Sequence, residues 1–282
     1  MDNCNLPQEL IDIILDNLHD DYMALRSCSL VRHSWLPTCH RHIFRHVVLL
    51  PTNKYALYAK RPIKSYSQRL HGILFNSPHI ANYIQQLKVY EGQFAKHEDW
   101  IKTDQTLPLV LRSLTNLKRI EFRRLYWNDL PLDLRRSIGS VLELPSLTFI
   151  EIENAYFVSM DELVGLLQRA RRLTGLSLTD ISTDSKPPVD KDRDTVEEEQ
   201  RFDLHQRGLL VDLRLALVDY PSFIKWVLGP QSPFEVSHIH TLNISDPYSD
   251  IETFNRLLHA IGGSLNHIEL SVPLWDLSSE CA

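Results

Sequence analysis

The sequence predicts an α/β fold made of stacked strand–helix units, with parallel strands on one face and helices on the other. Three observations indicate it: leucine is abundant, a short apolar pattern recurs seven times, and amphipathic segments separate the copies. Leucine accounts for 45 of the 282 residues, whereas glycine accounts for 9. Hydrophobic residues make up 43% and charged residues 23% of the chain, which is ordinary for a folded protein and excludes a wholly disordered one.

The recurring pattern is apolar-x-x-apolar-x-apolar, repeated at intervals of 26 to 37 residues. Its last three positions alternate as in a short strand that buries one face. A unit of this size cannot bury its own apolar face, so the copies are expected to stack. The middle apolar residue falls at Leu87, Ile120, Ile150, Leu176, Leu213, Leu242 and Ile268, with a weaker eighth copy centred on Val47.

Two of the intervening segments carry helix signals. Ser159 and Glu162 have the spacing of a capping box, and an apolar stripe follows them. A second stripe begins at Phe254 and stops at Gly262.

On these copies, residues 80–272 resemble the leucine-rich-repeat family in an irregular form. The Asn or Cys that usually follows each strand is mostly missing, and Asn154 is its nearest match. The resemblance implies that residues 47–282 form an irregular leucine-rich-repeat-like solenoid. The residues alone also allow an ordinary α/β domain with a few strands of this pattern.

Residues 1–46 do not follow the repeat and predict three short helices. An apolar stripe from Leu10 to Leu18 follows Pro7, which suits a helix start, and Asp20 or Asp21 would cap a second helix. A third helix would start near Trp35. So small a core usually needs a metal, a disulfide or a partner, and a partner is the economical inference because the first stripe is too wide for this interior.

This segment carries a second resemblance. Its Leu-Pro turn, its apolar stripe and the later run Leu-x-x-Cys-Ser-Leu-Val-x-x-x-Trp resemble the F-box motif. In that family these residues dock onto a Skp-type adaptor, which connects to the cullin scaffold of an SCF ubiquitin-protein ligase. The residues that the resemblance assigns to adaptor contact, or to its support, are Leu6, Pro7, Leu10, Ile14, Leu15, Leu30, Val31 and Trp35. The alternative is a self-contained helical hairpin packed on the repeat, with Trp35 in its core.

Together the resemblances imply a substrate-recognition adaptor of an SCF-type ligase. The F-box would hold the Skp-type adaptor, and through it the cullin, while the repeat face would hold a target protein. Such a protein is no enzyme and needs no catalytic residue, cofactor or metal, because its contribution is proximity. The expected location is cytoplasmic and/or nuclear.

The repeat geometry nominates a recognition face, because side chains between the buried strand positions point to the open side. Aromatic and arginine side chains are the strongest anchors in interfaces. The candidates for target binding are therefore Tyr90, Arg119, Arg123, Phe149 and Arg214. Alternatively this face binds nothing, and its mixed Arg and Glu side chains pair with each other.

Two other functional classes stay open. A ligase-independent scaffold or inhibitor built on the repeats would leave the stripe after Leu6 and Pro7 unexplained. An enzyme would need converging titratable groups, and no nucleotide-binding, serine-hydrolase or zinc-protease motif occurs. Cys39, His42 and His46 share a helical face, but closed zinc sites usually draw paired ligands from two segments.

Net charge and targeting signals argue against some classes of partner. The net charge is −6, which argues against binding nucleic acid or an anionic membrane, and no secretory signal or membrane-spanning run occurs. The four cysteines are dispersed, which fits a reducing compartment. Residues 182–207 interrupt the repeat; because residues 184–203 hold eight acids and four bases, we expect a disordered acidic loop there.

Overall fold

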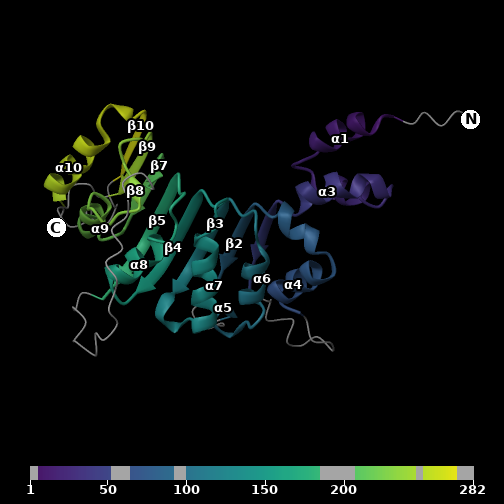
Figure 1. Ribbon diagram of the computed structural model, residues 1–282, viewed down its shortest axis with the longest axis horizontal. Coiled ribbons are helices and arrows are strands. Elements are labelled where there is room, and N and C mark those ends of the chain that lie inside the picture. The colour runs from purple at the N-terminus through teal and green to yellow at the C-terminus, as the bar shows by residue number, and fades with distance from the viewer. Residues whose placement is uncertain (1–5, 52–63, 92–99, 185–206, 246–249, 272–282) are drawn as a thin grey trace, which may run out of the picture.

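The computed structural model describes residues 6–51, 64–91, 100–184, 207–245 and 250–271, and its main feature is a parallel sheet of eight strands (Figure 1). A second, two-stranded sheet pairs β6 (Gly208–Leu209) with β8 (Phe234–Glu235). The strands of the main sheet, in spatial order, are β1 (His46–Leu49), β2 (Gln86–Tyr90), β3 (Arg119–Tyr126), β4 (Phe149–Phe157), β5 (Gly175–Thr183), β7 (Asp212–Ala216), β9 (Thr241–Ser245) and β10 (His267–Ser271).

Helices line one side of this sheet, and α1 and α3 lie beyond its β1 end (Figure 1). The N-terminal helices are α1 (Gln8–Asp16), α2 (Tyr22–Cys28) and α3 (Leu36–Ile43), with a 3₁₀ turn at His33–Trp35. The helices between or after strands are α4 (Tyr66–Asn76), α5 (Trp100–Thr103), α6 (Leu107–Ser113), α7 (Leu132–Leu142), α8 (Met160–Leu167), α9 (Tyr220–Val227) and α10 (Ile251–Ile261). The α/β class and the parallel sheet are therefore as the sequence predicted.

The sequence repeat and the sheet register coincide. Val47 pairs with Leu87, and the middle apolar residue of each further copy pairs with that of the next, ending at Ile268. The weak eighth copy is thus strand β1. From β2 to β9 the middle and last apolar residues of each copy are only 0–2% exposed, so each strand adds two side chains to one continuous core. Each such burial stabilises the fold by about 1.5–3 kcal/mol.

The predicted helix signals act largely as expected. The Asp21 side chain caps α2 by accepting from the Ala24 amide, and Gly262 ends α10 with a φ of 63°. The Ser159 hydroxyl accepts from the Glu162 amide at the start of α8. The Glu162 carboxylate, however, accepts from the amide of Val158 rather than from that of Ser159, so the capping box closes one residue early.

The N-terminal helices have a small core of their own. Ile11, Leu15, Leu25 and Cys39 form a buried cluster separate from the core of the sheet. At the end of α1 an Asp16 carboxylate oxygen accepts from Arg41 at 2.6 Å and lies 2.7 Å from His42 Nε2, both on α3. The hydrogen bond from His42, aided by Arg41, holds the pKa of Asp16 below its ordinary value.

The predicted acidic loop overlaps the sheet at its first residues. Ser182 and Thr183 belong to β5, where they pair with the end of β4, so the expected boundary at 182 is wrong. The strand extends because β4 is equally long and offers backbone partners. Residues 185–206 lie outside the described residues.

Residues with a left-handed backbone conformation bend adjacent strands at equivalent positions. Arg124, Asn154, Asp180 and Leu217 have φ values of 53–62°, and each directly follows a residue at the same register level. The Asn154 amide donates to the Asp180 carboxylate at 2.7 Å, which links two of these left-handed residues. Asn and Asp tolerate this conformation, whereas a leucine is strained by roughly 1–2 kcal/mol.

A hydrogen-bond network around Asp104 links the start of α4 to the start of α6. One Asp104 carboxylate oxygen accepts from the hydroxyls of Ser65 and Ser67, and the other accepts from the hydroxyl and amide of Thr106 and the amide of Leu107. Burial opposes ionisation, but hydrogen bonds, first from Ser67 and Thr106, outweigh it and lower the pKa of Asp104.

Replacing Leu217 by glycine should raise stability. Leu217 is exposed and left-handed, so glycine removes the strain and loses little packing, and we expect a gain of about 0.5–1 kcal/mol in the free energy of urea unfolding. The matched control is Leu209→Gly, at an exposed leucine without positive φ, which should destabilise the protein. Equal losses from both substitutions would contradict the strain argument.

Asp104→Asn should destabilise the protein by about 1–3 kcal/mol at neutral pH, because the amide cannot accept all five hydrogen bonds. A carboxylate whose pKa is lowered by folding stabilises the fold above its unfolded pKa of about 3.9. That contribution disappears as the pH falls through the folded pKa. Urea unfolding from pH 7 to about pH 2 should therefore show a constant difference between the wild type and the variant above about pH 4 and a shrinking one below it. A difference that does not change in acid would be inconsistent with an ionised Asp104.

Candidate protein-interaction surfaces

The N-terminal segment exposes a large set of apolar side chains, on α1, on α2 and in the residues beside these helices. Their exposed fractions lie between 47% and 84%, in a part of the chain whose own core holds only four buried residues. We call this set the N-terminal apolar surface: Leu6, Leu10, Ile13, Ile14, Tyr22, Met23, Leu30 and Val31. Exposed apolar patches on folded proteins mark sites where another surface docks.

The helical period explains why α1 has two apolar faces. Ile11 and Leu15 lie four residues apart and point into the core. Leu10 and Ile14 share the same spacing, rotated by about 100°, and therefore point outward beside them. The stripe is wider than the small interior can absorb, as the sequence predicted.

The structure exposes some of the residues proposed to bind the adaptor and buries others. Pro7 is exposed and precedes α1, with its carbonyl accepting from the amides of Leu10 and Ile11. Leu15 is 1% exposed, so it supports the surface from the core and is not available as a contact. Trp35 is half-buried and packs against the same core. The other five residues of the predicted set are members of the N-terminal apolar surface.

Three members of this surface were not among the predicted site residues. Ile13 extends the stripe of α1, and Tyr22 and Met23 project from the first turn of α2. Ile13 was detectable, since it lies three residues after Leu10 on the same side of the helix. The exposure of Tyr22 and Met23 depends instead on how α2 rotates against α3.

The second candidate surface is the open face of the sheet, opposite the helices. Parallel in-register pairing arranges its side chains in rows that cross the strands. One row runs from Arg119 through Phe149 to Gly175, with the guanidinium carbon of Arg119 4.0 Å from the ring centroid of Phe149. That ring lies where a β-carbon on Gly175 would stand, so the glycine lets it lean across the neighbouring strand.

The arginines and acids of this face pair with each other. Arg119 donates to Glu151 at 2.5 Å. Arg123 lies 3.0 Å from Glu121 and 2.6 Å from Glu153, and its guanidinium carbon is 5.7 Å from the ring centroid of Tyr90.

Glu121 is the unusual member of this network. Its side chain is only 3% exposed although it points to the open face, and it also pairs with Lys88. A carboxylate buried this far must keep charged partners to offset its lost hydration. Lys88 and Arg123 supply the charged partners that this burial calls for.

Arg214 on β7 forms a separate pair. Its guanidinium donates to both oxygens of Asp212 on the same strand, at 2.7 and 3.0 Å. The hydrogen bonds from this two-pronged contact raise the pKa of Arg214 further. The alternative that Arg and Glu pair on this face therefore describes Arg119 and Arg123, whereas Arg214 pairs with an aspartate of its own strand. The rings of Tyr90 and Phe149 each lie beneath an arginine.

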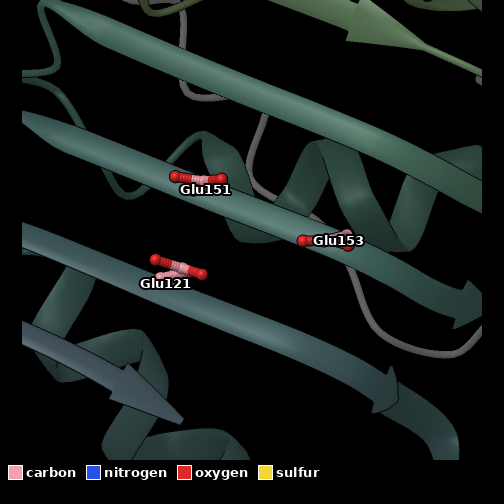
Figure 2. Close-up of side chains that lie close together, drawn as sticks. All are labelled: Glu121, Glu151 and Glu153. Atoms are coloured by element: carbon pink, nitrogen blue, oxygen red, sulfur yellow. The ribbon is translucent and has the colours of Figure 1, made fainter. Parts of the chain in front are cut away.

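Three carboxylates of this face approach one another closely, as Figure 2 shows: Glu121 on β3 lies opposite Glu151 and Glu153 on β4. Their oxygens fall within 4.8 Å of one another, close enough to share a cation. Each already has a basic neighbour, from Lys88, Arg119 or Arg123. Three positive charges balance the three negative ones, so ion pairs account for the cluster.

Comparisons with known proteins give no family for this chain. No protein-family model matches it, and no curated protein matches it either. The two family resemblances therefore stay predictions. Within the described residues, no helix is both long enough and apolar enough to cross a membrane.

Arg123→Ala and Arg214→Ala should lower the free energy of unfolding by different amounts. The first removes a partner from a carboxylate that is 3% exposed, and we expect a loss of about 1–3 kcal/mol in the free energy of unfolding. The second removes a pair whose acid, Asp212, is 22% exposed, and should cost about 0–1 kcal/mol. Urea titration of both variants measures the difference; similar small costs would show that Glu121 does not depend on Arg123.

Proposed function

We propose that this protein is a substrate-recognition adaptor of an SCF-type ubiquitin-protein ligase. In this proposal residues 1–46 form an F-box that binds a Skp-type adaptor, and residues 47–282 form an irregular leucine-rich-repeat solenoid that binds a target protein. The observation that carries the proposal is the N-terminal apolar surface. Five of the eight residues that the F-box resemblance assigns to the adaptor are apolar and 47–84% exposed: Leu6, Leu10, Ile14, Leu30 and Val31.

The physical argument is that these apolar side chains are not buried within the chain's own N-terminal core. Each of these side chains gains about 1.5–3 kcal/mol when it is fully removed from water. The N-terminal helices cannot supply that cover, because Ile11, Leu15, Leu25 and Cys39 already fill their core. A partner with an apolar groove would bury the surface and complete the small module at the same time.

In this proposal the adaptor and the target bind different parts of the molecule. The helices α1 and α3 lie beyond the β1 end of the sheet, which continues from there to β10 (Figure 1). A ligase attached at one end would leave the open face accessible to a target. Holding a target lysine near a charged enzyme accelerates transfer by proximity alone, so the chain would need no reacting group of its own.

For target binding we retain Tyr90, Arg119, Arg123, Phe149 and Arg214 as the proposed anchors. The ion pairs give them a second property, because a target with carboxylates or basic groups could exchange partners with the network at little electrostatic cost. Arg214 is the most exposed of the five.

A ligase-independent scaffold or inhibitor is the second candidate. The paired, nearly neutral open face favours it, since such a face suits binding a protein without a further partner. The N-terminal apolar surface discriminates between the two functions, because only the adaptor function requires it.

The test is co-purification with a Skp-type adaptor. Leu10→Ala combined with Ile14→Ala should reduce recovery of the adaptor by about tenfold or more, because both side chains are exposed contacts in the proposal. Circular dichroism should be unchanged, since neither residue belongs to the core. The matched control is Ile251→Ala, an equally exposed isoleucine on α10, which should leave recovery intact. A wild-type chain that recovers no adaptor, or a double variant that recovers as much as wild type, would overturn the proposal.

A further inference from the structure

The last strand of the sheet has an unpaired side. β10 pairs with β9 along one edge, and within the described part of the chain no strand pairs with its other edge. The amide of His267 donates to His240, next to β9, so the backbone groups of residues 267, 269 and 271 point toward β9. Because backbone direction alternates along a strand, the N–H and C=O groups of Ile268 and Leu270 point outward.

The same two residues expose apolar side chains. Ile268 and Leu270 are 42% and 43% exposed, whereas the equivalent residues of β2 to β9 are 0–2% exposed. On the inner strands a neighbour on each side completes the cover. On β10 the described residues provide a neighbour on one side only, so Ile268 and Leu270 form an exposed apolar edge of the described sheet. An uncovered strand edge of this kind is a template for pairing.

We propose that this edge is an interface with a second copy of this chain. The two β10 strands would pair antiparallel about a two-fold axis perpendicular to the sheet, which keeps the helices of both molecules on the same side. Such an interface is self-complementary, because each residue meets its counterpart across the axis. The outward backbone groups of Ile268 would then bond to those of the partner's Ile268.

Charge selects this register. With Ile268 on the axis, His267 of each molecule lies directly opposite Glu269 of the other, so imidazole and carboxylate meet twice on the open face. With Glu269 on the axis, two carboxylates would face each other, which is destabilising. The amide of Asn243 donates to Glu269 at 2.5 Å and holds its carboxylate on this face. The first register therefore combines backbone bonds and apolar contact with an imidazole that can donate to each carboxylate, and it keeps the two carboxylates apart.

The size of the edge sets the expected affinity. A strand of five residues makes a small interface, of the kind that forms weak complexes, so we expect dissociation constants of about 1–100 µM.

The first test is the mass of the full-length chain by sedimentation equilibrium over that concentration range. The wild type should shift from 32.8 kDa toward twice this value. Ile268→Lys places two ammonium groups against each other on the axis and should weaken the dimer by about tenfold or more. The matched control Ile251→Lys, at an exposed isoleucine of α10 away from the edge, should leave the dimer intact. A chain that stays monomeric, or a control that behaves as Ile268→Lys does, overturns the proposal.

A charge exchange tests the register. His267→Glu should weaken the dimer, because it sets two acids opposite each other, and adding Glu269→Lys should restore it. Failure of the second change to restore the dimer overturns the proposed register. Hydrogen exchange of residues 267–271 should show protection that rises with protein concentration. Protection that is the same at all concentrations in a monomer would assign the edge to another part of the same chain, such as residues 272–282, and would overturn the proposal.

Discussion

From β2 to β9, every strand of the main sheet buries the same two apolar positions, and the backbone pairing holds those positions level from strand to strand. A shift of one residue in any strand would turn its buried pair toward the open face and bring polar side chains into the core. The register therefore carries both the hydrophobic core and the rows of side chains on the open face. Leu87, Ile120 and Ile150 show the first effect, and Arg119 beside Phe149 shows the second.

The open face illustrates how the same register handles charge. Rows that place Glu121 beside Lys88 and Arg123 allow a carboxylate to be almost fully buried without a free charge in the protein. The network is close to neutral, so it presents paired groups and not a field of one sign. A target that binds there would meet side chains already ordered by their neighbours, which lowers the entropy lost on binding.

The two ends of the sheet share a physical feature: each leaves apolar groups uncovered. At the β1 end, the N-terminal helices are too few to bury Leu10, Ile14 and Leu30. At the β10 end, no further strand covers Ile268 and Leu270 among the residues that the structure describes. The interior strands have no such surplus, because each is covered by the next copy. Interactions through apolar contact are therefore expected at the ends, and interactions through polar contact on the face between them.

The sequence by itself determined the strand positions, the register and the start of the N-terminal helices. It could do so because alternation, helical period and capping residues such as Asp21 act over a few neighbouring residues. It also indicated that the stripe of α1 exceeds its core. Only the tertiary structure decided which face each residue finally occupies: Leu15 lies inside, Met23 lies outside, and Glu121 is buried on an open face. Those outcomes depend on how helices rotate and how side chains on adjacent strands pair, and these contacts join residues far apart in the chain.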